Sequence, residues 1–260
     1  MSGTEKPVNT PARQRRAERR RATYEEMLSL ARDALREGRP VSLRAIAADM
    51  GMTAPALYRY VDSHAALQEV LGESILDDVL GRMREAADSW PPERHGHRLV
   101  CSLYAFRSWA LSRPEEFRLV FGQPRTPEDA EATLAGRLPH RIRFTWHLMS
   151  CLAGMHRAGR VGAALDEEVP EEFRAELVRL QELCAQDGHE IDAPIGLWWT
   201  AVTHWIVLCG VVRMEVDRMP GEALVADGIL FREALALCGQ GIGVPADRVS
   251  ETVGEAVRRC

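Results

Sequence analysis

The chain has 260 residues, of which 46% are hydrophobic and 27% charged, a composition that excludes a wholly disordered or fibrous protein. Its net charge of −5 is unevenly distributed. Residues 1–60 hold twelve Lys and Arg against seven Asp and Glu, whereas the rest of the chain holds 21 against 31. A basic N-terminal part on an acidic body indicates that the first part meets a polyanion and the body does not.

No apolar stretch of the secretory kind opens the chain, so we expect a cytoplasmic protein. One segment has the length of a membrane span, because residues 193–212 carry no formal charge. Three polar side chains, Thr200, Thr203 and His204, lie at its centre, where polar groups are costly in lipid. We therefore favour a helix buried on most of its faces in a soluble protein, and expect no membrane partner.

The sequence offers little to an enzyme or a metal. Its six cysteines lie far apart, without the paired spacing of a zinc site. His95 and His97 lie near Cys101, but two residues apart they point to different sides of a helix. Motifs of the GxSxG, phosphate-loop and HExxH kinds are missing from the sequence. We expect no catalytic residues, no metal and no other cofactor.

In chain order, the first expected feature is a basic tail over residues 1–16 with few apolar groups, which predicts disorder. The basic run RQRRAERRR at 13–21 leads into a helix, because apolar residues then recur at i, i+3, i+4 and i+7 as far as Gly38. The run is either a solvated tail or an arm that contacts a nucleic acid, in the minor groove for example.

Three capping residues then mark three helices. Ser42 is placed to cap a short helix that runs to about Asp49, Thr53 to cap a second, and Ser63 to cap a long third. Gly51 supplies the turn between the two short helices. Neither is long enough to be stable alone, so each depends on its neighbours for burial.

Past a boundary near residues 86–92 the pattern stays helical, and no segment alternates like a strand. The fold class is therefore all-α. The helices expected in this part span residues 93–112, 114–121, 128–136, 140–157, 170–186, 194–218 and 221–238.

The two short helices, buttressed by a longer one before them, predict a helix-turn-helix. Ala47 is small enough for the second short helix to pack across it, Gly51 takes the turn, and Leu57 fills the shared core. Arg44 points outward from the first short helix.

The stretch SLRAIAADMGMTAPALYRYVDSHAAL, within residues 22–80, resembles the DNA-binding domain of the TetR family of bacterial repressors. The resemblance implies a helix-turn-helix domain over residues 17–88, a ligand-binding and dimerisation domain over 89–240, and a tail over 241–260. RSWALSRPEEFRLVFGQP at 107–124 and WIVLCGVVRME at 205–215 are similar to a C-terminal subtype with a W-x-x-x-H-G signature, although Cys209 stands where that subtype has histidine.

Carried onto this sequence, the resemblance implies a recognition helix at 53–59. Its first residues would face base edges, Tyr58 and Tyr60 would position it through phosphates, and Arg44 would reach a phosphate or a guanine. His64 stands where the family commonly has a phosphate-binding lysine, so its hold should be weaker and sensitive to pH. The residues expected at the DNA are Arg44, Thr53, Ala54, Pro55, Ala56, Tyr58, Tyr60 and His64.

This recognition helix has little base-reading chemistry beyond one hydroxyl and two alanines, Ala54 and Ala56. Alanine contacts only apolar features such as the thymine methyl group. We therefore expect specificity to rest on thymine contacts and Arg44, with much of the affinity coming from phosphate neutralisation.

The expected function is a homodimeric regulator of transcription. We expect a repressor that is released from an inverted-repeat DNA operator when a small apolar or aromatic effector binds. Helices 194–218 and 221–238 are expected to form the dimer interface. Two alternatives stay open: a thiol switch at Cys260, which follows two arginines, and a helical carrier that binds no DNA. The residues expected to line the effector pocket are Tyr104, Trp109, Trp146, His147 and His204.

Overall fold

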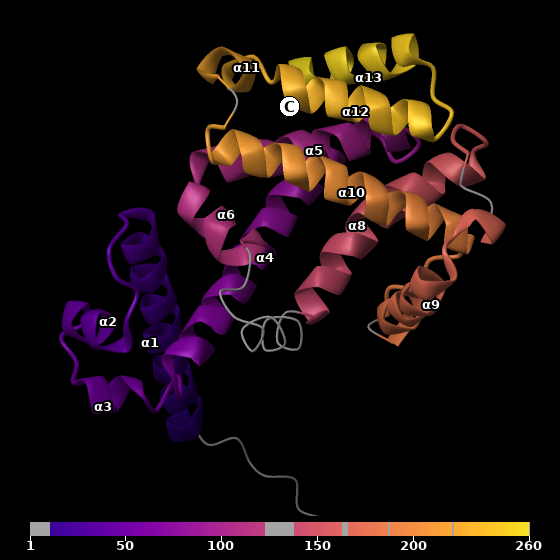
Figure 1. The fold of residues 1–260 in the computed structure, drawn as a ribbon. Helices are drawn as coiled ribbons and strands as arrows, with labels where there is room; N and C mark the ends of the chain where they lie inside the picture. The colour runs from indigo at the N-terminus through magenta and orange to yellow at the C-terminus, as the bar shows by residue number, and fades with distance from the viewer. Residues whose placement is uncertain (1–10, 123–137, 163–165, 187, 220, 260) are drawn as a thin grey trace, which may run out of the picture. The chain divides into compact units, whose positions relative to one another are not determined.

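The structure is a computed structural model that describes residues 11–122, 138–162, 166–186, 188–219 and 221–259. For residues 11–12 and 138–142 it describes the backbone alone. Within these ranges every regular element is a helix (Figure 1), which confirms the all-α fold class. The chain divides into two compact units, residues 1–74 and 75–260. The division falls inside helix α4 (His64–Asp88) rather than at residue 88, because one continuous helix contributes buried residues to both units.

The first unit holds α1 (Pro11–Arg36), α2 (Leu43–Asp49), α3 (Ala54–Leu57) and the start of α4. Two of the expected caps are confirmed. The hydroxyl of Ser42 accepts the backbone N–H of Ala45 at 3.2 Å, and that of Ser63 accepts the N–H of Ala66 at 3.1 Å.

Helix α1 begins at Pro11, so residues 11–16 are helical where we expected a disordered tail. The segment reads PARQRR, in which arginine, glutamine and alanine are strong helix formers. Proline is well tolerated at the first position of a helix, because its missing N–H has no partner there anyway. Local propensity therefore outweighs the lack of apolar residues.

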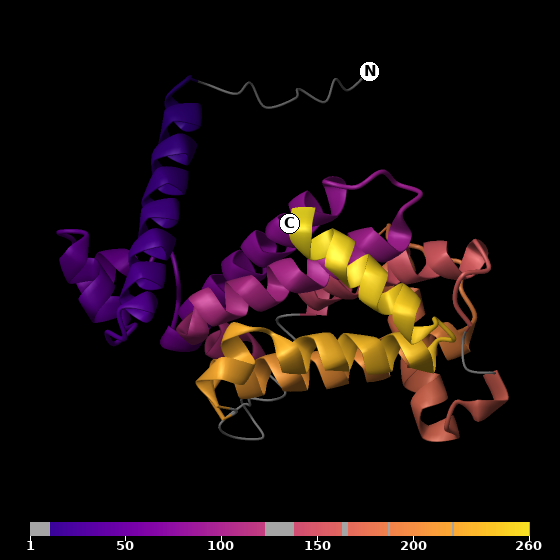
Figure 2. The same cartoon turned by 90° about the horizontal axis from the view of Figure 1, so that it is seen from above.

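The second unit starts within α4 and continues through helices that lie side by side (Figures 1 and 2). The helix expected at 128–136 lies outside the described residues, and the one expected at 221–238 is divided by Gly228, whose φ of +61° ends α11. The elements are α5 (His95–Ser112), α6 (Pro114–Phe121), α8 (Leu138–Arg157), the 3-10 turn η1 (Asp166–Glu168), α9 (Glu171–Gln186), α10 (Ile195–Val216), α11 (Glu222–Ala226), α12 (Ile229–Gly241) and α13 (Ala246–Arg259).

Helix α13 occupies most of the segment that we expected to be a tail. It packs against α5 and α12 (Figure 2) and buries Val249, Val253 and Ala256, which recur at helical spacing. Nε2 of His97 on α5 lies 2.8 Å from a carboxylate oxygen of Glu255 on α13. The apolar spacing of this segment was a usable signal, because such a stripe indicates a buried helix face.

Helix α10 is, among the described residues, the helix whose length and composition would allow it to cross a membrane. In the structure it packs against α5, α8, α9 and α12. Leu208 and Val212 are buried on its inner side, whereas Ile206 is 63% exposed on the outer side. The expectation of burial on most faces is therefore corrected, because one long apolar face stays uncovered within the single chain.

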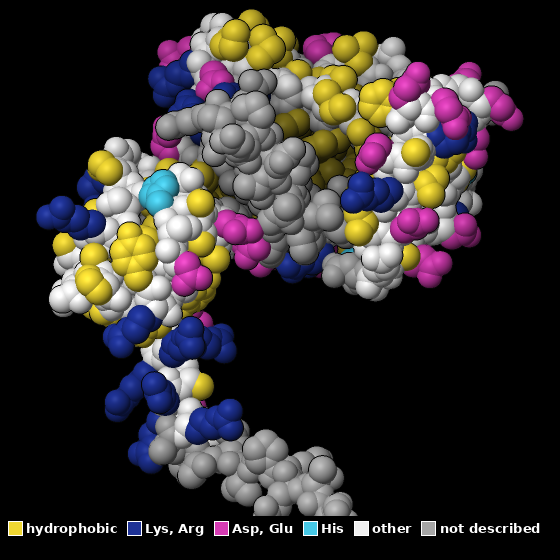
Figure 3. All heavy atoms as spheres, turned by 60° about the horizontal axis from the view of Figure 1, so that its bottom comes forward, with side chains coloured by type: hydrophobic (Ala, Val, Ile, Leu, Met, Phe, Trp, Pro, Cys, Tyr) yellow, Lys and Arg dark blue, Asp and Glu magenta, His cyan; other side chains and the backbone are white. Residues whose placement is uncertain are grey.

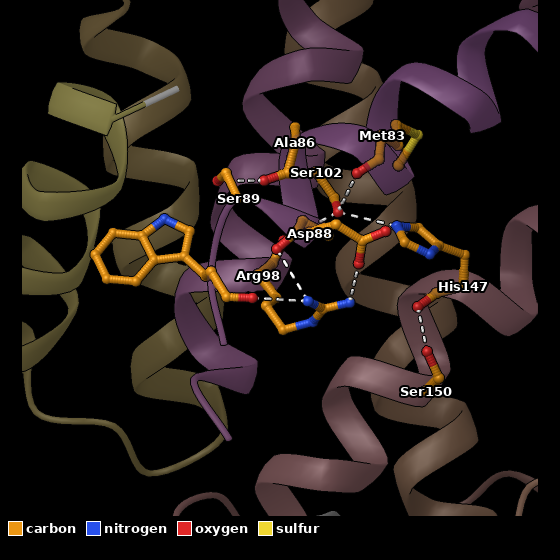
Figure 4. A network of polar contacts seen from close by, with 10 residues as sticks. Met83, Ala86, Asp88, Ser89, Arg98, Ser102, His147 and Ser150 are labelled. Atoms are coloured by element: carbon orange, nitrogen blue, oxygen red, sulfur yellow. Dashed lines mark hydrogen bonds and ion pairs between the residues drawn. The ribbon is translucent and has the colours of Figure 1, made fainter. Parts of the chain in front are cut away.

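A polar network fixes the end of α4 to α5 and α8 (Figure 4). The guanidinium of Arg98 donates to the carbonyls of Ala87 and Trp90 at 3.1 and 2.9 Å. The hydroxyl of Ser102 lies 3.0 Å from the carbonyl of Met83 and 2.9 Å from Nε2 of His147. All of these residues belong to the second unit.

Candidate functional site

The short helix α3 is held from behind and open in front. Leu57 is fully buried beneath it, and the N–H of Met52 donates to the carbonyl of Ala47 at 2.8 Å across the turn at Gly51, where φ is +64°. Glycine adopts such a backbone conformation with little strain, unlike most other residues. The expected turn, with Ala47 and Leu57 in the core, is therefore present.

The outer side of α3 carries the residues expected at base edges. Thr53 and Pro55 are exposed, and Ala54 and Ala56 are partly exposed. Thr53 occupies the N-cap position, but its side chain makes no capping hydrogen bond, unlike the expectation. The Thr53 hydroxyl is therefore not engaged in capping α3. The helix itself is shorter than the expected 53–59, because residues 58–60 form a turn.

Around α3 lie the residues expected at phosphates. Arg44 is exposed on α2, and Tyr58 is 49% exposed. Tyr60 is partly buried, and the guanidinium carbon of Arg20 lies 5.9 Å from the centre of its ring. Tyr60 therefore contributes packing as well as a hydroxyl group.

His64 is exposed, but Nε2 of its ring lies 2.8 Å from the carbonyl oxygen of Val41. Since a carbonyl only accepts, Nε2 carries the proton and donates it there. His64 thus joins the start of α4 to the segment before α2, a role that sequence reasoning missed.

The second unit contains a partly open cavity of about 140 Å³ between α5, α8, α10, α12 and α13. Its walls are almost wholly apolar, and Leu103, Leu152 and Leu208 are among them. A cavity of this size lined by aliphatic residues has room for a molecule about as large as benzene. Val249 and Thr252 on α13 form part of its wall.

The ionisable groups in the wall are held neutral. Burial lowers the pKa of His204 below its ordinary value, since a charged imidazole would lose its hydration. Burial also raises the pKa of the Cys238 thiol to about 11. The described lining contains no Asp, Glu, Lys or Arg. The cavity therefore offers no counter-charge to an ionised ligand.

Of the five residues expected at the effector, the structure places His204 in this cavity. Tyr104 and Trp109 instead line a wider hollow of about 860 Å³, bordered by α4, α5, α12 and α13. Trp109 also packs its ring against Phe106 and Phe117 in an aromatic cluster.

The remaining two candidates lie elsewhere. The ring of Trp146 packs edge-on to that of His189 with centroids 4.7 Å apart. His147 is buried against Ser102, and burial lowers its pKa to about 4. The residues predicted to contact the effector are polar and aromatic, whereas the cavity walls are chiefly aliphatic. The apolar spacing of residues 99, 100 and 103 on α5 was the available signal.

A buried core residue behind an exposed recognition helix, with a tight turn between two short helices, defines a helix-turn-helix DNA-binding unit. The second unit adds a helical body with an apolar cavity. Together they define the class of regulators that bind DNA through one unit and carry a separate helical domain.

Comparison with known proteins identifies the family within that class. Residues 99–236 match the family model described as "Tetracyclin repressor-like, C-terminal domain". The chain is 32% identical over 202 residues to the HTH-type transcriptional regulators Rv1816 of Mycobacterium tuberculosis and Mb1846 of Mycobacterium bovis. That match covers 74% of this chain and 79% of each relative. The chain belongs to the TetR family of helix-turn-helix transcriptional regulators.

The fold has a counterpart among solved structures. The crystal structure of SCO4313, described as a regulatory protein, aligns with a TM-score of 0.54. The two chains are 23% identical, and the alignment covers 84% of this chain and 98% of the other. The likeness supports the fold.

Proposed function

We propose that this regulator is a homodimeric repressor that leaves a palindromic operator when a small, neutral, apolar molecule enters the cavity of the second unit. The observation that carries the proposal is the charge-free cavity, whose few polar side chains include His204 and Thr252. The protein acts in the cytoplasm, at the nucleoid, where its operator lies.

Operator binding is supported by the surface of the first unit. Thr53 and the partly exposed alanines of α3 face outward, with Arg44 and Tyr58 exposed on either side. Base contacts from α3 give the sequence preference, and Arg44 and Tyr58 hold the phosphates. A two-fold dimer places its two recognition helices 34–36 Å apart, about one turn of B-DNA.

Dimerisation is supported by the uncovered faces of α10 and α12, which pack against each other within the chain. Ile206 and Val207 are 63% and 45% exposed on α10, and Leu237 is 65% exposed on α12. Large apolar side chains gathered on neighbouring helices mark an interaction surface. A second copy with the same two helices would complete a four-helix bundle.

The class of effector follows from the cavity walls. An ionised ligand would lose its hydration with no opposite charge to replace it, which costs several kcal/mol or more. A neutral molecule with an aromatic or branched aliphatic body fits the apolar surface. One hydroxyl or carbonyl group can exchange a hydrogen bond with the neutral ring of His204.

A route from ligand to DNA runs through α5. Leu99 and Leu103 line the cavity, and their neighbours Arg98 and Ser102 hold the end of α4. A ligand that displaces α5 therefore acts on α4, whose other end belongs to the DNA-binding unit. Release requires only that the ligand bind the non-binding conformation better, and a coupling of about 1–3 kcal/mol changes operator affinity roughly 5–150-fold.

Selection of bound duplexes from a random pool at fixed salt tests the proposal. We expect the selected duplexes to share an inverted repeat. If no sequence is enriched, the proposal that the protein binds a specific operator is wrong. Toluene and benzoate, added to the selected complex, then test the effector class. Toluene should bind the protein and weaken the complex, and a stronger effect of benzoate would contradict the cavity argument. A Leu103→Trp variant, which fills the cavity, should keep DNA binding and lose the response.

The thiol switch has less support. Cys260, its candidate residue, lies outside the described residues. Burial raises the pKa of Cys151 as well as that of Cys238, which keeps both as unreactive thiols at neutral pH. Operator binding measured with and without mild oxidant distinguishes this mechanism from ligand release.

A further inference from the structure

Helix α1 projects well beyond the core of the DNA-binding unit. Its first fully buried residue is Met27, whereas residues 13–22 are all exposed. At 1.5 Å per residue, the exposed stretch adds a rod about 15 Å long. The Lys and Arg side chains of this projection gather along it (Figure 3). They are Arg13, Arg15, Arg16, Arg19, Arg20 and Arg21.

These arginines are not equivalent, because an α-helix turns by 100° per residue. Arg13, Arg16 and Arg20 fall on the side of α1 that carries Met27 and Ala31, both fully buried further along. The side of the helix that covers the helix-turn-helix therefore continues past it as an arginine stripe. We call these three residues the inner stripe.

One contact fixes the stripe relative to the recognition helix. The guanidinium carbon of Arg20 lies 5.9 Å from the centre of the Tyr60 ring, just after α3. The inner stripe thus runs outward from the edge of the α3 surface.

The other sides of the projection are different. Nε of Arg21 lies 2.7 Å from a carboxylate oxygen of Glu25, and Glu18 lies on the same side. The inner stripe has no carboxylate between its arginines, and within the described residues Arg13 and Arg16 have no ion-pair partner in the chain. Unneutralised guanidinium groups at regular spacing match a row of phosphates.

We propose that the inner stripe is a second DNA-binding surface, which binds the phosphate backbone beside the groove occupied by α3. This inference rests on the proposed operator binding. A helix with its side chains is about 10–12 Å wide, whereas the minor groove is about 6 Å wide, so the projection binds across phosphates and does not enter the minor groove. It therefore increases the affinity for DNA, the length of DNA that the protein contacts and the salt dependence of binding, but it adds no preference for particular bases.

The test compares two triple variants of the same helix. R13Q/R16Q/R20Q removes the inner stripe, and R15Q/R19Q/R21Q removes the same charge from the other sides. Both are measured by fluorescence anisotropy on the duplex recovered by selection, from low to high salt. Each lost phosphate contact reduces the magnitude of the slope of log affinity against log salt by about 0.9. The slope of the R13Q/R16Q/R20Q variant should therefore be smaller in magnitude by about 2.7 per half-site. The control variant should lose much less.

Three outcomes overturn the inference. In the first, the two triple variants lose equal amounts of slope, which indicates diffuse electrostatic attraction. In the second, the control variant loses more slope than the stripe variant. The third outcome is an unchanged slope in the stripe variant. If the unmodified protein selects an inverted repeat in any of these cases, the proposed function stands and the inner stripe alone is refuted. If it selects nothing, the proposed function fails.

Arg20 also packs on Tyr60, so a variant without the Arg20 change is needed. R13Q/R16Q leaves that contact intact and should lose about 1.8 of the slope per half-site. Circular dichroism should show unchanged helix content and unfolding temperature for all variants. Loss of affinity without loss of slope would indicate a folding defect and would count against the stripe.

Discussion

Arg107 and Glu215 form a buried, two-pronged ion pair between α5 and α10. Nε and Nη2 of the guanidinium lie 2.7 and 3.2 Å from the two carboxylate oxygens, and the side chain of Glu215 is fully buried. Nη2 also donates to the carbonyl of Val225 in α11 at 2.6 Å. One side chain thus joins three elements of the second unit.

Arg107→Met should lower the free energy of unfolding by about 3–5 kcal/mol, because it leaves the Glu215 carboxylate buried without a counter-charge. The double variant Arg107→Met/Glu215→Leu should recover most of that loss, since it removes both charges. Urea titration of the three proteins measures the difference. A double variant no more stable than the single one would show that the pair acts through packing.

His147 should make the protein sensitive to acid. Its folded-state pKa is lowered to about 4 by burial, below the ordinary 6.5. Its stabilising contribution is therefore complete above about pH 6.5 and is lost as the pH falls through 4. Between pH 8 and pH 5 the loss is about 2 kcal/mol.

The His147→Gln variant provides the comparison. Its free energy of unfolding should change less between pH 8 and pH 5 than that of the unmodified protein, by about the same 2 kcal/mol. The pKa values of His95 and His204 are also lowered, so part of the dependence should survive in the variant. Identical pH profiles would mean that His147 is hydrated in solution.

Gly239 should tolerate no side chain. A Cβ atom built there would lie 2.5 Å from Cγ2 of Val249, where α12 meets α13. Gly239→Ala should cost about 1–3 kcal/mol by overpacking, and adding Val249→Ala should relieve it. At Gly81 on α4 a Cβ atom would meet nothing within 4 Å, so Gly81→Ala should stabilise by about 0.5–1 kcal/mol. Thermal unfolding of the variants measures whether Gly239→Ala destabilises and Gly81→Ala stabilises the protein.

The dimer interface can be tested by charge. Ile206→Arg on α10 should convert the dimer to a monomer in analytical ultracentrifugation, because a buried arginine without a partner is costly. Val178→Arg on α9 is the control, since Val178 is 41% exposed but lies on another helix. Dissociation by the control, or a dimer that persists in Ile206→Arg, would move the interface elsewhere.

Thymine readout can be tested on the selected operator. Replacing a contacted thymine with uracil removes one methyl group, worth about 0.8 kcal/mol if it is buried. The unmodified protein should therefore bind the uracil duplex roughly four-fold more weakly. In Ala54→Gly and Ala56→Gly this discrimination should shrink, and unchanged discrimination would place the methyl contact on another residue.

The features that sequence predicted well are local ones. Ser42 and Ser63 cap helices because a serine oxygen at the N-cap can accept an otherwise unpaired backbone N–H of the first turn, and Gly51 supplies the turn because few residues adopt its backbone conformation. The start of α1 was missed, because a tail poor in apolar residues was weighed above its helix propensity. The cavity was missed for a different reason: its walls come from five helices far apart in sequence, and only packing shows which apolar stripes leave a gap.

Because a ribosome releases the N-terminus first, the DNA-binding unit is complete long before the wall of the cavity that α13 supplies. A nascent or prematurely ended chain without that helix has a recognition surface but lacks one wall of the cavity. If the proposed function is correct, such a fragment would bind operators without responding to the effector.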